Sequence, residues 1–120
     1  AIIGCGGHTR SSINLLKQYD YNISGIFDDS YDKSKQERIH NLTLLGKVQD
    51  IDSRHLVFLS IGNNHNRKQL YKQLKKRLIK KNLFHKTAFI ENNLVIGHSN
   101  QIYSNVYINY IFHDLLLNLL

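Results

Sequence analysis

The chain has 120 residues, 42% of them hydrophobic, a formal net charge of +7 and one cysteine. This composition excludes a disordered protein, and the length is sufficient for a domain with a hydrophobic core. No run of about 18 apolar residues is present, so we expect no membrane span, and the short apolar start before the glycines does not resemble a secretory signal. The lone Cys5 cannot form an internal disulfide, which agrees with a reducing cytoplasm.

The first part of the chain alternates strand-like and helix-like segments. We expect strands at residues 1–4, 22–27, 42–45 and 55–61, helices at 9–19 and about 64–81, and a helical turn within 46–51. The polar stretch 30–41 is predicted to be a loop. In the second helix, Leu70, Leu74 and Leu78 recur every four residues and form one apolar stripe. This order of elements predicts an α/β fold, with a small parallel sheet and helices on its faces.

Basic residues are concentrated between Arg67 and Lys86. Such a cluster is typical of a nucleic-acid site, of a surface that binds acidic membranes, or of a solvated helix face. We favour the solvated face, because the leucine stripe occupies one side of the predicted helix and few aromatic residues alternate with the lysines. We therefore expect no nucleic-acid partner, and strongly salt-dependent binding to a duplex would revive that alternative.

From about residue 84 the pattern changes to a period of six. Isoleucines recur at this spacing, and a second set precedes each of them by two positions: Ile90, Ile96, Ile102 and Ile108, with Ala88, Leu94, Asn100 and Val106. A hexapeptide period predicts a left-handed parallel β-helix, with two or three ordinary strands as the alternative. The register ends at Asp114, and the pattern does not explain the apolar tail 111–120. We divide the chain into an α/β domain, 1–83, and the incomplete beginning of a β-helix, 84–120.

A glycine-rich turn follows the first predicted strand and precedes the first helix. Gly4, Gly6 and Gly7 permit a tight turn and close approach of a ligand, and the helix start offers free N–H groups to a phosphate. Asp28, at the end of the second strand, is placed to accept hydrogen bonds from a ribose or a base. Thr9 stands where a dinucleotide fingerprint has glycine or alanine, so we favour a single nucleotide or a nucleotide sugar over NAD. A nicotinamide-dependent reductase and a purely structural turn are the alternatives.

A second motif, SIGNN at residues 60–64, lies at the end of another predicted strand. Gly62 permits close approach, and Asn63 and Asn64 suit a base or a pyrophosphate, although Asn64 is equally suited to cap the following helix. Arg67 is within reach of a phosphate, but we favour a surface role. The seven histidines show no metal-ligand spacing, and His8 alone occupies a suggestive position. Cys5 is interpreted as a packing residue.

These motifs occur together in one known family. IIGCGGHTR, GIFDDS, LVFLSIGNNHNRKQLYKQL and the hexapeptide repeats resemble bacterial sugar acetyltransferases of the sialic-acid and bacillosamine type. The resemblance implies a Rossmann-like domain that binds a nucleotide sugar, most simply UDP-linked, and a left-handed β-helix that forms homotrimers and binds acetyl-CoA. It implies acetyl transfer to an amine or hydroxyl of the sugar in surface glycan biosynthesis. The implied substrate-binding residues are Gly4, Gly6, Gly7, His8, Asp28, Asp29, Gly62 and Asn63.

The resemblance also implies a general base, a histidine in a later coil of the β-helix. The sequence has no stretch that matches it, and we do not assign this role to His113, the nearest imitation. The chain therefore corresponds to the sugar-binding half of such an enzyme, with the catalytic residue unassigned. A non-catalytic module that binds a nucleotide or nucleotide sugar is the alternative function.

Overall fold

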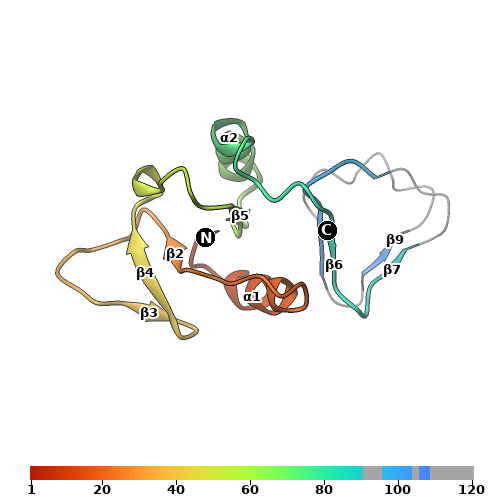
Figure 1. Ribbon diagram of the computed structural model, residues 1–120, viewed down its shortest axis with the longest axis horizontal. Coiled ribbons are helices and arrows are strands. Elements are labelled where there is room, and N and C mark those ends of the chain that lie inside the picture. Colours follow the sequence, from red (N-terminus) through yellow and green to blue (C-terminus); the bar gives the residue numbers. More distant parts are fainter. Residues whose placement is uncertain (91–95, 104–105, 109–120) are drawn as a thin grey trace.

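A parallel sheet forms the centre of the first part of the chain (Figure 1). The computed structural model describes residues 1–90, 96–103 and 106–108, and for residues 107 and 108 it describes the backbone only. The strand order is β3-β4-β2-β1-β5. The bounds are β1 (Ile2–Ile3), β2 (Ile26–Phe27), β3 (Arg38–Ile39), β4 (Leu42–Gly46) and β5 (Phe58–Leu59). All neighbouring pairs are parallel except β3 with β4, which are antiparallel at the edge.

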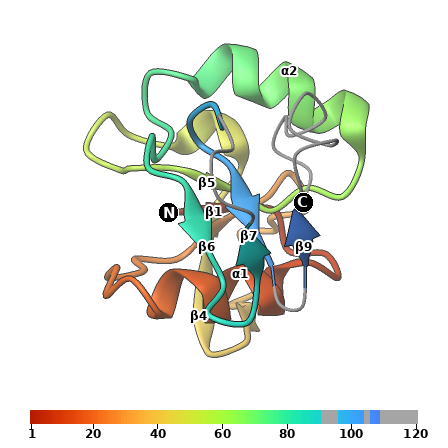
Figure 2. The ribbon, with the colours of Figure 1, turned by 90° about the vertical axis from the view of Figure 1, so that its right-hand side faces the viewer.

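One helix covers each face of this sheet, as Figures 1 and 2 show. Successive strand residues point to opposite faces, so Ile2 packs in the cluster with α1 (Thr9–Lys17) and Ile3 in the cluster with α2 (Asn64–Leu74). Both isoleucines are fully buried. This arrangement confirms the predicted α/β class. Among the described residues, no helix is long and apolar enough to cross a bilayer.

The second part of the chain forms one coil of a parallel β-helix. Strand β6 (Leu83–Phe84) pairs with β8 (Gln101–Ile102), and β7 (Phe89–Ile90) pairs with β9 (Tyr107–Ile108). Each residue is paired with the residue three hexapeptides further along the chain, as a three-sided coil requires. The side chains at six-residue spacing share one core: Ile102 with Phe84, Ala88, Ile90, Ile96 and Val106. The predicted hexapeptide repeat is confirmed for these residues, whereas Leu94, Asp114 and the tail 111–120 lie outside the described residues.

A buried asparagine joins successive levels of the coil. Asn100, at a repeat position, is 2% exposed, and its backbone N–H and its side-chain amide donate to Oδ1 of Asn82 at 2.9 and 3.2 Å. These bonds satisfy polar groups that would be costly to bury unpaired. The coil is also tied to α1, because the Tyr19 hydroxyl donates to the Phe84 carbonyl at 3.1 Å and accepts from the Phe84 N–H at 2.7 Å. The boundary between residues 83 and 84 stays a prediction.

The predicted second helix is too long. Helix α2 ends at Leu74, and Leu78 forms a parallel bridge with Val57 at the edge of β5. The Val57 N–H donates to the Arg77 carbonyl at 2.8 Å, and the Ile79 N–H donates to the Val57 carbonyl at 3.1 Å. Val57 is fully buried, so its backbone needs partners. Leu78 therefore belongs to the core beside the sheet and not to a helix stripe.

The predicted loop 30–41 contains strand β3. It forms a hairpin with β4 through His40 and Asn41, whose φ angles are +49° and +67°. Two consecutive residues with positive φ are typical of the type I′ hairpin turn, which asparagine adopts readily. The stretch was predicted to be a loop because its residues are mostly polar and show no apolar alternation.

Candidate functional site

The sheet has one switch point, between β1 and β5. The chain passes from β1 to β2 on one side, whereas β5 lies on the other side of β1. The loops that follow the two strands therefore diverge, and such a crevice is where open α/β sheets bind ligands. Residues 4–7 form one wall of this crevice, and residues 60–63 form the other.

Two glycines bring these walls together. Gly4 has a φ of +103°, and a Cβ there would lie 2.5 Å from the Ser60 carbonyl oxygen, so no other residue fits without strain. A Cβ at Gly62 would lie 3.1 Å from the imidazole Cδ2 of His8. The His8 side chain therefore rests against the second loop, and the two sequence motifs meet at this point.

Gly6 and Gly7, unlike Gly4 and Gly62, face open space. A Cβ at either position would meet nothing within 4 Å. Both residues are exposed at the start of α1, where backbone N–H groups lack helical partners. The turn thus has an open side next to the helix start, which leaves room for a ligand.

Thr9, which departs from the dinucleotide fingerprint, stabilises the turn. It is fully buried, and its hydroxyl donates to the Gly4 carbonyl at 3.1 Å. Its backbone N–H donates to the Gly6 carbonyl at 3.1 Å. A side-chain hydrogen bond here holds the tight conformation of the loop, so Thr9 belongs to the architecture of the turn.

The aspartates after β2 also shape the site. Asp28 accepts from the Cys5 N–H at 3.1 Å and from the Ser30 N–H at 2.8 Å, so it fixes the glycine turn to the end of β2. Burial alone would raise the pKa of Asp28, but the hydrogen bonds from Ser30 and Cys5 outweigh burial, and the pKa is lowered. Asp29 accepts from the Val48 N–H at 3.1 Å, in the short 3-10 helix that follows β4. Asp28 is therefore part of the turn's framework, whereas Asp29 fixes the segment after β4.

Asn63, not Asn64, caps α2. Oδ1 of Asn63 accepts from the Asn66 N–H at 3.0 Å, whereas Oδ1 of Asn64 accepts from the Arg67 guanidinium. The predicted cap at Asn64 is wrong by one residue. Arg67 also donates to the Ile61 carbonyl at 2.8 Å, and it is half-buried rather than a surface residue.

The coil reaches the switch point through a buried hydroxyl group. Oγ of Ser12, a fully buried residue of α1, lies 2.8 Å from Oγ of Ser60 and 3.2 Å from the hydroxyl of Tyr103, which follows β8. Burial raises the pKa of Tyr103, while Ser12 and Arg67 act in the opposite direction. Sequence reasoning missed Ser12 and Tyr103. The signal for Ser12 was a serine on the apolar face of the first helix.

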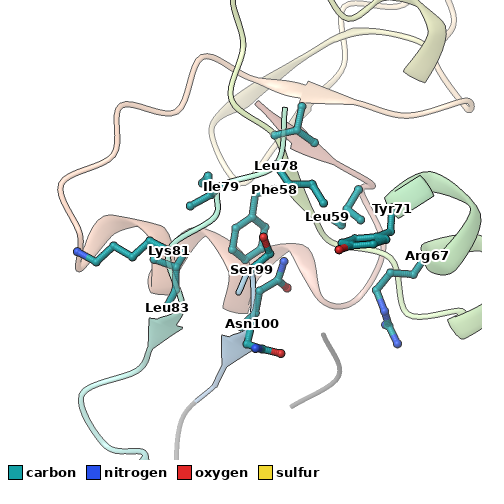
Figure 3. A pocket seen from close by; sticks show the side chains of 12 residues that line it. Phe58, Leu59, Arg67, Tyr71, Leu78, Ile79, Lys81, Leu83, Ser99 and Asn100 are labelled. Atoms are coloured by element: carbon teal, nitrogen blue, oxygen red, sulfur yellow. The ribbon is translucent and has the colours of Figure 1, made fainter. Parts of the chain in front are cut away.

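A second cavity lies between the sheet, α2 and the coil (Figure 3). Phe58 and Leu59 come from β5, and Asn100 from the start of the coil's second level. Arg67 extends from α2 past Tyr71 toward the rim. Arg67 also lines the neighbouring pocket beside His8, so it lies between this cavity and the switch-point crevice.

A cysteine nucleophile and a metal centre are two further kinds of site that the sequence could supply. Burial raises the pKa of the Cys5 thiol, which disfavours a thiolate nucleophile. In the described ranges, no group of three or more histidine, cysteine, aspartate or glutamate side chains is placed to hold a metal ion.

Residues 1–74 match the family model of the PglD N-terminal domain. The chain belongs to this family. The match confirms the resemblance that the motifs indicated, and it covers the sheet and α2 but not the coil. No curated protein matches the chain.

Solved structures extend the fold similarity of this PglD N-terminal domain into the coil. A variant of perosamine N-acetyltransferase from Caulobacter crescentus, in complex with CoA and GDP-perosamine, has a TM-score of 0.71 and 22% identity, over 90% of this chain and 52% of that chain. The acetyltransferase domain of PglB from Neisseria gonorrhoeae has a TM-score of 0.73 and 18% identity, over 88% of this chain and 53% of that chain. The chain thus spans about half the length of these proteins.

In this PglD N-terminal domain, the predicted site residues divide into two groups. The turn residues and Gly62 meet around His8 at the switch point. Asn63 ends the second wall, and Asp28 follows β2 and is bonded to the first wall, but hydrogen bonds that shape the loops already engage both side chains. The assignment of all the predicted residues to a ligand stays a prediction.

Proposed function

We propose that this chain is the nucleotide-sugar-binding part of an acetyl-CoA-dependent acetyltransferase, which acts on a nucleotide-linked amino sugar in surface glycan biosynthesis. The observation that carries the proposal is the switch-point crevice, where Gly6 and Gly7 face open space beside His8 and the first coil packs at its rim. The proposed substrate-binding residues are Gly4, Gly6, Gly7, His8, Asp28, Asp29, Gly62 and Asn63.

The proposed roles follow from the chemistry of each group. The N–H groups of Gly6 and Gly7 suit a phosphate, because they lie at the positive end of α1 and no hydrogen bond with the described residues engages them, unlike those of Cys5 and Thr9. Asp28 is the proposed acceptor for ribose hydroxyls or a base, in addition to the N–H groups of Cys5 and Ser30 that it accepts in the turn. Gly4 and Gly62 act by permitting the close approach of the two walls.

Acetyl-CoA is the proposed acetyl donor. CoA is present in the complex of the perosamine N-acetyltransferase, and acetyl coenzyme A in a complex of the PglB domain. The described residues contain one coil, which is too little to test a fit, so we assign no residue to acetyl-CoA. A homotrimer formed by a completed β-helix and a cytoplasmic location are part of the same proposal. His113 lies outside the described residues, and the general base stays unassigned.

Two measurements test the proposal. Calorimetry of the chain with UDP, GDP and their amino sugars is expected to show binding, with UDP favoured; the GDP-perosamine complex of the Caulobacter protein makes GDP the necessary comparison. Radiolabelled acetyl-CoA with the same sugars is expected to label the sugar when the full reading frame is expressed. Binding without transfer in the full protein would support the alternative, a non-catalytic nucleotide-sugar module.

A matched pair of variants connects binding to the crevice. Gly6→Val places a side chain in the open side of the turn and is expected to abolish nucleotide binding while the protein stays folded. Gly97→Val adds the same volume at an exposed position of the coil, where the nearest atom is 4.0 Å from the new Cβ. Equal binding by both variants would place the nucleotide elsewhere.

A further inference from the structure

The pocket beside His8 is built from both parts of the chain. His8 comes from the glycine turn, Arg67 from the first turns of α2, and Gln101 and Tyr103 from β8 and the residue after it. Gln101 and Tyr103 are joined by a hydrogen bond of 3.0 Å between the tyrosine hydroxyl and Oε1 of the glutamine. The first coil therefore closes the pocket that the sheet opens.

Arg67 gives this pocket its charge. The lining residues include no aspartate or glutamate, and no carboxylate in the described part of the chain forms an ion pair with Arg67. Its guanidinium is fixed by the Ile61 carbonyl at 2.8 Å and by the Asn64 side chain. Both partners are neutral, so the guanidinium is held in a defined orientation and no carboxylate of the described residues neutralises its charge.

The position of Arg67 does not serve the helix. It lies near the start of α2, where the helix dipole disfavours a cation, and that first turn has no acidic residue. Burial lowers the pKa of Arg67, because partial removal from water disfavours the charged guanidinium, while Tyr103 acts in the opposite direction. An anion bound in the pocket would reverse both unfavourable effects.

We propose that Arg67 binds the diphosphate of the nucleotide substrate and acts together with the glycine turn. His8 belongs to the turn and also lines the pocket with Arg67, so the two anion-binding features are contiguous. A ligand with two adjacent phosphates matches them better than a monophosphate, because one phosphate occupies the turn and the other meets the guanidinium. A guanidinium suits this role since it binds phosphate oxygens through paired N–H donors. This inference rests on the proposed function and adds Arg67 to the residues that bind its nucleotide substrate.

The test compares Arg67→Gln with Lys68→Gln. Each variant removes one positive charge at adjacent positions of α2, but Lys68 is exposed and does not line the pocket. Arg67→Gln is expected to weaken UDP binding about ten- to hundredfold in calorimetry, the range of a charge-assisted hydrogen bond. Lys68→Gln is expected to change it less than about twofold, as for a screened surface charge. With UMP the effect of Arg67→Gln should be several times smaller.

The outcomes separate this inference from the proposed function. If the unaltered chain binds neither UDP nor GDP, the proposed function is wrong and the inference with it. If the chain binds UDP but both variants weaken binding equally, the inference alone is overturned. Should Arg67→Gln fail to fold, Arg67→Lys decides, since it keeps the charge and loses the paired donors. UDP affinity unchanged in Arg67→Lys would then overturn the inference, and a loss of about threefold or more would support it.

Discussion

The hydroxyl oxygens of Ser12 and Ser60 lie 2.8 Å apart and join α1 to the carboxyl end of β5. Ser12 is fully buried, and Ser60 is 4% exposed. The same hydroxyl of Ser12 approaches the Tyr103 hydroxyl at 3.2 Å. One small polar side chain thus connects the sheet, the helix that follows the glycine turn, and the coil.

Replacement of Ser12 by alanine is expected to lower the free energy of unfolding by about 1–3 kcal/mol, because it leaves buried polar partners unpaired. Ser11→Ala is the matched control, since Ser11 is the adjacent, exposed residue of the same helix. Urea unfolding followed by circular dichroism measures both. Equal stabilities would show that the hydroxyl contacts contribute nothing.

Replacement of Gly4 by alanine is expected to cost at least about 2 kcal/mol of stability, because the backbone is in the left-handed region and the new Cβ meets the Ser60 carbonyl. Gly6→Ala is expected to stay within about 1 kcal/mol of the wild type, because nothing lies near its Cβ position. Thermal unfolding of the two variants compares them directly. A Gly4→Ala protein as stable as Gly6→Ala would contradict the close approach of the two walls.

Asp28 is expected to contribute to the pH dependence of stability. Its pKa is lowered in the folded protein, so its contribution is fully present above the ordinary carboxyl pKa of about 4 and is lost as the pH falls through the lower, folded value. Asp28→Asn should therefore be less stable than the wild type at pH 7 and lose less stability on acidification. The pKa of Asp52, about 2, also gives acid sensitivity, but both proteins retain it. If the stabilities of the wild type and Asp28→Asn fell in parallel between pH 2 and 5, the lowered pKa of Asp28 would be refuted.

The contact between Tyr19 and Phe84 is expected to hold the coil against α1. Tyr19→Phe removes both hydrogen bonds to the Phe84 backbone and should cost about 1–3 kcal/mol, with faster amide exchange in β6. Tyr21→Phe is the control, because the Tyr21 hydroxyl forms no hydrogen bond with the described residues. Hydrogen exchange measured by mass spectrometry distinguishes the two variants. Unchanged exchange in β6 after Tyr19→Phe would show that other contacts fix the coil.

The sequence by itself determined the features that depend on local pattern. The alternation of apolar segments and turns specified the α/β class, and the six-residue period specified the coil, because each pattern places side chains on one face whatever the partner is. The glycines of both motifs marked the two walls of the crevice. Parallel strands then place the loops at their carboxyl ends along the same edge of the sheet, on the two sides of the crevice.

Only the tertiary structure decided which segments complete these elements. Leu78 was predicted to lie in a helix, but its segment pairs with Val57, whose buried backbone needs hydrogen-bond partners. No local sequence pattern indicates such a need. Arg67 became half-buried, and Ser12 met Tyr103, because the coil folds back onto the switch point. These contacts join residues far apart in the sequence, so their energies depend on the assembled sheet and coil rather than on neighbours along the chain.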